Sequence, residues 1–236
     1  MKKLLLMLFM AVAGIGSAGA QAYNGNHAFD GEHKNEVSGY IVAGNNVVTD
    51  GFGGLAASYT RHFTPRWHVG GDMQMQFGKQ LFSFDAGGGY RLPLKYGSLY
   101  FDGRFHYNRY HKFNFNEIIG NLSVIWESPY VDIRLGESII HYQHTGDGYT
   151  EPLTLTFGIG VNVRHRDNPW NLGLFFRNYD EFYYENWNIN WGIRFWAPLP
   201  KGMRLFGEFN VRPAGSISQL ASKYEGSVKL GLKYKW

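Results

Sequence analysis

The sequence predicts an all-β fold: a single antiparallel transmembrane β-barrel of meander topology, with twelve strands, or ten as the alternative. Three observations lead to it. Apolar and polar residues alternate over many segments of about ten residues, aromatic residues make up 17% of the chain, and no apolar run after residue 20 is long enough for a membrane helix. A chain that crosses lipid without helices must close its sheet, because lipid offers an open edge no hydrogen-bond partner.

The N-terminus has the three parts of a signal peptide. Lys2 and Lys3 are followed by the apolar run from Leu4 to Ala13 and by the small residues Ala18-Gly19-Ala20. An N-terminal membrane helix is the alternative, but the apolar run is shorter than the roughly 20 residues that cross a bilayer. We therefore expect residues 1–20 to be removed by cleavage after Ala20.

Residues 21–35 are polar and without period, and they predict a flexible periplasmic arm before a barrel over residues 36–236. Without the two lysines of the signal peptide, the formal charge falls from +4 to +2, which does not indicate nucleic-acid binding. The chain has no cysteine, so lipoprotein acylation, disulfides and thiolate chemistry are excluded. No sequence pattern indicates a cofactor or a structural metal site.

The clearest strand pattern runs from Leu153 to Arg166. Its odd-numbered positions up to Val163 are apolar, and its even-numbered positions are polar or glycine, which predicts one lipid-facing and one wet side. The same period is found in the following segments: Trp67 to Phe77, Phe82 to Leu92, Leu99 to Tyr107, Glu185 to Ala197, Met203 to Val211 and Tyr224 to Trp236.

A soluble β-sandwich also alternates in this way and is the competing fold. Aromatic residues stand at both ends of several apolar faces, as Trp67 and Phe77 do, while charges such as Asp72 occupy the opposite face at mid-strand. Together with the signal peptide, these aromatic belts favour a barrel with apolar residues outside and polar residues inside.

Turn residues predict the number of strands. Five short periplasmic turns are marked by these Pro, Gly and Asn clusters: Thr64 to Arg66, Pro93 to Gly97, Ser128-Pro129, Asp167 to Pro169 and Pro198 to Gly202. With both termini in the periplasm, five turns give six hairpins and therefore twelve strands. The predicted outer loops lie near the following segments: Asn45 to Gly53, Gly78 to Gln80, Tyr110 to Lys112, Gln143 to Pro152, Asn178 to Tyr184 and Arg212 to Ser222.

The last strand supplies a separate signal, because its apolar face ends in Tyr234 and the terminal Trp236. This strand resembles the C-terminal strand of bacterial outer-membrane β-barrels, which the barrel insertion machinery recognises. The resemblance covers the signal peptide, the alternating strands and this last strand, and it points to no narrower family. It implies a Gram-negative outer membrane, with the lipid bilayer, lipopolysaccharide and the insertion machinery as partners.

Alternation places many charged residues on the inner face. Charges in the lipid would cost roughly 2 to 4 kcal/mol each at the midplane, so an inward orientation is expected. The predicted lumen-lining charges are Asp72, Asp85, Asp102, Arg104, Glu117, Asp132, Arg134, Arg164, Arg177, Arg194, Glu208 and Lys229.

Two functions fit such an interior. The leading hypothesis is a barrel without enzymatic activity. It is either a narrow passive channel for small polar solutes or a structural barrel plugged by an ion-pair network. The alternative is an enzyme that modifies lipid or peptide at the outer leaflet. Its weak candidate site is a histidine and carboxylate group at the outer rim, formed by His106, His111, His141, His144 and Asp147.

The first strand is expected to pair with the last, which places Val37, Gly39, Ile41 and Ala43 on the lipid face. Two residues disturb the pattern. Arg61 faces lipid close to a periplasmic turn, and Glu137 interrupts an apolar face, which predicts a β-bulge between Leu135 and Ile140.

Overall fold

The computed structural model describes residues 34–46, 50–77, 81–111, 114–180, 183–184, 189–213 and 224–236. The predicted signal peptide, and the predicted arm up to residue 33, lie outside the described residues. No described segment forms a helix with the length and apolar character to cross a membrane.

The strands are β1 (Asn35–Asn46), β2 (Asp50–His62), β3 (Trp67–Gln76), β4 (Leu81–Leu94), β5 (Gly97–Tyr110), β6 (Phe115–Glu127), β7 (Val131–His144), β8 (Asp147–Asn162), β9 (Asn171–Arg177), β10 (Tyr179–Asp180), β11 (Tyr183–Tyr184), β12 (Asn190–Pro198), β13 (Met203–Pro213) and β14 (Tyr224–Lys235).

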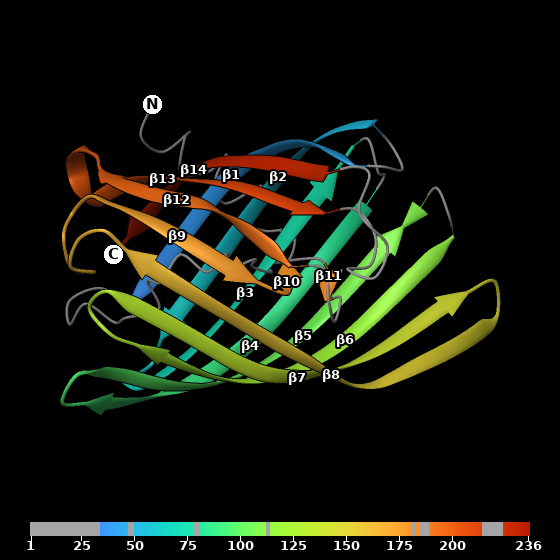
Figure 1. Ribbon diagram of the computed structural model, residues 1–236, viewed down its shortest axis with the longest axis horizontal. Helices are drawn as coiled ribbons and strands as arrows, with labels where there is room; N and C mark the ends of the chain where they lie inside the picture. Colours follow the sequence, from blue (N-terminus) through green and yellow to red (C-terminus); the bar gives the residue numbers. More distant parts are fainter. Residues whose placement is uncertain are drawn as a thin grey trace.

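Twelve of these strands form one closed barrel in which each strand is antiparallel to its neighbours along the chain (Figure 1). β10 and β11 form a separate two-stranded sheet between β9 and β12. The prediction of twelve strands rather than ten is therefore confirmed. Five connections share one end of the barrel with Trp236, and we call this end the C-terminal end.

The barrel closes between β1 and β14, in the predicted way. Val37 pairs with Tyr234, Ile41 with Leu230 and Ala43 with Val228. At the C-terminal end, the backbone groups of Asn35 and Trp236 exchange two hydrogen bonds of 3.0 Å each. Neither strand leaves an unpaired edge. The barrel therefore exposes no open sheet edge to lipid, where its backbone groups would lack hydrogen-bond partners.

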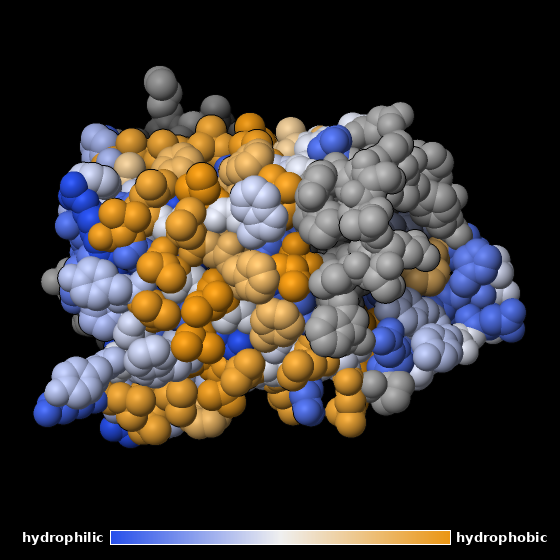
Figure 2. Space-filling model, in the orientation of Figure 1, coloured by the Kyte–Doolittle hydropathy of each residue, from blue (hydrophilic) through white to orange (hydrophobic). Residues whose placement is uncertain are grey.

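The outer face of the wall is apolar. Ile41, Leu122 and Ile193 are 56%, 73% and 42% exposed, whereas side chains one position along each strand point inward. In Figure 2 the apolar side chains gather over the middle of the visible face, with hydrophilic side chains toward both ends. A band of this kind is typical of a barrel surrounded by lipid.

The predicted outer loop from Gln143 to Pro152 is wrong, because the chain continues as a hairpin. β7 and β8 pair as far as His144 and Asp147, and only Thr145 and Gly146 form the turn. Both turn residues have positive φ, at 43° and 99°. Two such residues match the right-handed twist of the flanking strands, which a two-residue hairpin turn requires.

The predicted bulge exists, but the extra residue lies on the neighbouring strand. The register shifts between Ser138 and Ile140 of β7, which pair with Thr154 and Glu151 of β8. β8 thus holds two residues opposite one, and Leu153 has a positive φ of 54°. β7 keeps its alternation, so Glu137 points outward between Leu122 and Leu155.

Candidate functional site: the polar interior of the barrel

The inner face carries most of the charged residues that the sequence assigned to it. Arg104 is half-buried on this face, and the following are buried: Asp72, Asp85, Asp102, Glu117, Asp132, Arg134, Arg177, Arg194, Glu208 and Lys229. These side chains come from nine strands, and contacts with neighbours hold them against the wall.

Arg164 does not lie on the inner wall as predicted. β8 ends at Asn162, and the side chain of Asn171 accepts a hydrogen bond from the Arg164 backbone nitrogen at 3.0 Å. The same amide donates to the Arg164 and His165 carbonyls at 2.9 and 3.2 Å. The chain therefore bends away from the ladder, and the Arg164 guanidinium stacks 3.1 Å from the centre of the Trp170 ring.

The first group of charges lies on β3, β4 and β5. Arg104 Nε donates to Asp102 Oδ2 at 2.7 Å, and Arg104 Nη1 donates to Asp85 Oδ1 at 3.1 Å. His106 Nδ1 lies 2.6 Å from Asp85 Oδ2, and His68 Nε2 lies 3.6 Å from Asp102 Oδ1. Two carboxylates thus share one guanidinium, and we call Asp85, Arg104 and Asp102 the acidic triad.

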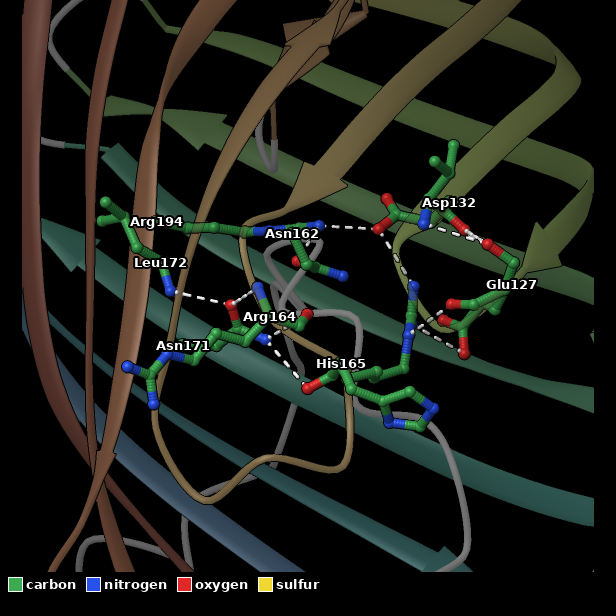
Figure 3. Close-up of polar contacts among 11 residues, drawn as sticks. Glu127, Asp132, Asn162, Arg164, His165, Asn171, Leu172 and Arg194 are labelled. Atoms are coloured by element: carbon green, nitrogen blue, oxygen red, sulfur yellow. Dashed lines mark hydrogen bonds and ion pairs between the residues drawn. The ribbon is translucent and has the colours of Figure 1, made fainter.

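The second group lies at the C-terminal end, where β7, β12 and the β8–β9 connection meet (Figure 3). Asp132 Oδ1 accepts from Arg194 at 2.6 Å and from Arg166 at 3.1 Å, and Arg166 also contacts Glu127 at 3.0 Å. Arg194 also donates to Asn162 Oδ1 at 3.0 Å. Asp132 and Arg194 are both fully buried.

Arg166 attaches the β8–β9 connection to the wall. Its backbone nitrogen donates to the Pro129 carbonyl at 2.8 Å, and its Nε donates to the Ser128 carbonyl at 3.1 Å. Burial would lower the pKa of Arg166, but the carboxylates of Glu127 and Asp132 raise it above its ordinary value. The guanidinium therefore stays charged, and the ion pairs hold at every pH at which both carboxylates are ionised.

A third group mirrors the first in composition. Glu208 Oε1 accepts from Arg177 Nη2 at 2.7 Å and lies 3.6 Å from Lys229 Nζ. Two cations here share one carboxylate, and we call Arg177, Glu208 and Lys229 the basic triad. The three residues lie on β9, β13 and β14.

Three predicted charges remain: Asp72 is buried on β3, and Glu117 and Arg134 contact neutral side chains. Glu117 Oε2 accepts from Asn108 at 3.0 Å and from Tyr110 at 3.2 Å, while Arg134 donates to Asn121 Oδ1 at 2.7 Å. Sequence reasoning did not select Glu127 or Arg166 for the site. Each lies an even number of residues after a residue that faces inward. The period of two would therefore have placed both on the inner face.

The histidine group proposed for an enzyme does not assemble. His106 is buried on the inner face of β5, whereas His141 points outward on β7 and bonds Thr150 at 2.9 Å. His144 and Asp147 are exposed at the tip of the β7–β8 hairpin, and His111 is exposed beyond the end of β5. The described residues contain no group of three or more metal-ligating side chains.

The predicted insertion signal is on the outer face of the last strand. Tyr234 and Trp236 are 41% and 47% exposed, and their rings stack with centres 5.7 Å apart. Both lie at the C-terminal end, where an aromatic belt is expected at the edge of the lipid.

Comparison with known proteins gives structural likenesses only, since no family model and no curated protein sequence matches this chain. A structure of the KdgM porin in complex with disordered oligogalacturonate is 8% identical. It aligns with a TM-score of 0.58 over 85% of this chain and 99% of that one. The NanC porin is 11% identical, with a TM-score of 0.55 over 86% of this chain and 100% of that one.

The Acinetobacter baumannii outer-membrane protein Omp33 is 13% identical and aligns with a TM-score of 0.50 over 86% of this chain and 98% of that one. At these identities the likeness establishes the fold. Together with the apolar outer band and the closed sheet, it shows a porin-like β-barrel of the outer membrane type.

Proposed function

We propose that this chain is a narrow passive channel that carries small polar solutes across the outer membrane of a Gram-negative bacterium. The observation that carries the proposal is the division between an apolar outer wall and an inner wall lined by charged groups from nine strands. Charged inner walls are how such pores select solutes.

Several large inner side chains lie flat along the wall. A Cβ placed on Gly87 would lie 2.7 Å from Cγ of Arg104, and one on Gly173 would lie 3.0 Å from Nε of Arg194. Glycine at these positions lets the long side chains lie against the backbone of the next strand. This arrangement places the charged side chains along the inner wall.

Some buried polar groups on the inner face need water as a hydrogen-bond partner. The Ser83, Ser123 and Thr154 hydroxyl groups are buried and have no hydrogen-bond partner among the described residues. Buried polar groups are nearly always hydrogen-bonded, to protein or to ordered water. Their number and spread over three strands support a hydrated lumen.

The bore is expected to be narrow. Barrels of eight strands are filled by side chains, and those of about 16 leave an open channel, so twelve strands fall between them. The buried aromatic residues Tyr40, Tyr100, Trp196 and Phe206 take further space on the inner face. Small solutes are therefore the class that this barrel can pass.

A plugged structural barrel is the second candidate, because Asp132 and Arg194 are fully buried at the C-terminal end. Conductance separates the two. The chain without residues 1–20, refolded and inserted in a planar bilayer, should give discrete current steps in potassium chloride. Bilayers that stay sealed after insertion, with insertion verified by the heat-dependent gel mobility of the folded barrel, would contradict the channel and support the plug.

We propose that the C-terminal end faces the periplasm, with both termini there, and that Tyr234 and Trp236 form the signal for the insertion machinery. The short connections at that end and the aromatic side chains at its edge support this orientation. Lipopolysaccharide would then surround the opposite end, in the outer leaflet.

A further inference from the structure

The inner charges are separated into two opposite walls. In a ring of twelve strands, β3 to β6 lie directly across from β9, β12, β13 and β14. Among the described side chains, the inner face of β3 to β6 holds Asp72, Asp85, Asp102, Glu117 and Glu127 against Arg91 and Arg104. The opposite wall holds Arg177, Arg194, Arg204, Lys229, Lys233 and Lys235 against Glu208.

Ion pairs at the ends of the barrel reduce the separation of charge there, but the separation remains at the centre. Glu36 of β1 lies 2.8 Å from Lys233 and 3.6 Å from Lys235, so these two lysines have a carboxylate beside them. Arg194 binds Asp132 of β7. The centre keeps the acidic triad on β4 and β5, with His68, His106 and the buried Asp72 beside it, and the basic triad on β9, β13 and β14.

The two triads have opposite compositions. The acidic triad contains two carboxylates and one guanidinium, and the basic triad contains two cations and one carboxylate. β5, which carries Asp102 and Arg104, lies across the barrel from β13, which carries Glu208. An electric field therefore runs across the lumen, at right angles to the path of a solute. The low dielectric constant of the surrounding wall strengthens this field.

We propose that this transverse field selects small zwitterions, solutes that carry an ammonium and a carboxylate group on one short skeleton, over uncharged solutes of the same size. The inference rests on the proposed channel function. A zwitterion can turn its cationic end toward the acidic triad and its anionic end toward the basic triad as it passes. A simple anion or cation is attracted by one wall and repelled by the other.

The test compares two isomers in liposomes that contain the refolded chain. Glycine is a zwitterion, and glycolamide has the same atoms without the charges. Glycine should enter about threefold faster in a swelling assay, because its separated charges align with the field much more strongly than the amide dipole of glycolamide does. Equal rates would overturn the inference while leaving the channel standing, and a barrel that passes neither solute and shows no conductance would overturn both.

Charge variants locate the effect in the triads. Asp102→Asn leaves the pair Asp85 and Arg104, and Lys229→Gln leaves the pair Arg177 and Glu208. Reversal potentials in a salt gradient should shift toward anion preference in the first variant and toward cation preference in the second. The double variant should regain the ion selectivity of the parent yet pass glycine and glycolamide equally fast.

The result for the double variant distinguishes an effect of the transverse field from an effect of net charge. This variant weakens the field but keeps the net charge of the lumen. Asp147→Asn combined with Lys201→Gln is the matched control, since both side chains are exposed at the ends of the barrel. It should keep the preference for glycine. A double triad variant that also keeps the preference, while folded by gel mobility, would contradict the proposal.

Discussion

Glu137 is an acidic residue on the lipid side of the wall. It is the seventh residue of β7 and lies between Leu122 and Leu155, which are 73% and 54% exposed. A carboxyl group in this band is unfavourable near the midplane, although less so than Arg or Lys. Glu137→Leu should therefore stabilise the folded barrel in lipid by about 1 to 2 kcal/mol.

Equilibrium unfolding in urea, with the barrel in lipid vesicles, measures this difference. Asp147→Leu is the control, because Asp147 lies at the exposed hairpin tip beyond the apolar band. A stability gain of the same size from both variants would show that added hydrophobicity, rather than removal of a carboxyl from lipid, is the cause.

Arg194 and Asp132 form the most deeply buried ion pair of the described residues, with 0% exposure on both side chains. Arg194→Met should destabilise the barrel by about 3 kcal/mol, because it leaves the buried Asp132 carboxylate with one cation fewer. The double variant with Asp132→Asn should be more stable than the single one, and an additive double-mutant cycle would contradict this coupling.

At the scale of elements, the β8–β9 connection is held to the wall through Arg166. Arg166→Gln removes the ion pairs with Glu127 and Asp132, so the backbone of residues 163–170 should open more often. Hydrogen exchange of these amides is expected to accelerate by about tenfold or more. Arg164→Gln, which removes only the stacking on Trp170, should leave the exchange close to that of the parent.

This connection also shows where sequence reasoning stops. The period of two placed Arg164 on the inner wall because the pattern continues past Asn162, but the side chain of Asn171 takes over the backbone groups of the turn. A pattern of apolar and polar residues carries no information about such a local hydrogen bond. The strand ends at Asn162, four residues before the alternation does.

The β7–β8 hairpin shows the same limit from the other side. Its residues from Gln143 to Thr150 are all exposed and mostly polar, and on composition they are typical of a loop. They pair because Thr145 and Gly146 form a tight turn, and because the bulge in β8 corrects the register. Both are backbone features: the turn leaves no periodic trace in the sequence, and the break at Glu137 predicted a bulge but not the strand that carries it.

At the scale of the whole molecule, the sequence predicted the strand number from its turn clusters, and the closing pair from the requirement that a sheet in lipid has no open edge. Turn clusters marked one end of the barrel, and alternation assigned an inner and an outer face to each strand. The structure places the predicted charged residues from Asp72 to Lys229 on the inner face, apart from Arg164. Their partners were not predictable, since Arg166 and Glu127 are 39 positions apart and meet only when β6, β7 and β8 pair.

Closure itself can be tested with an engineered bond, which the absence of natural cysteines makes simple. Ile41 and Leu230 are direct partners across the seam between β1 and β14. Ile41→Cys with Leu230→Cys should form a disulfide on oxidation, and Ile41→Cys with Val228→Cys, out of register, should do so far less. Equal yields in both variants would indicate a seam that slips.

The paired β7–β8 hairpin carries Thr145 and Gly146 to its tip, at the end of the barrel away from Trp236. A tight turn on a long paired ribbon accepts inserted sequence without disturbing the lipid-embedded strands. A short antibody epitope placed between these two residues should therefore be labelled on intact cells, and the same epitope between Lys201 and Gly202, in the β12–β13 connection, should be labelled only after the outer membrane is opened. The hairpin would then serve as a platform for displaying foreign peptides on a living cell.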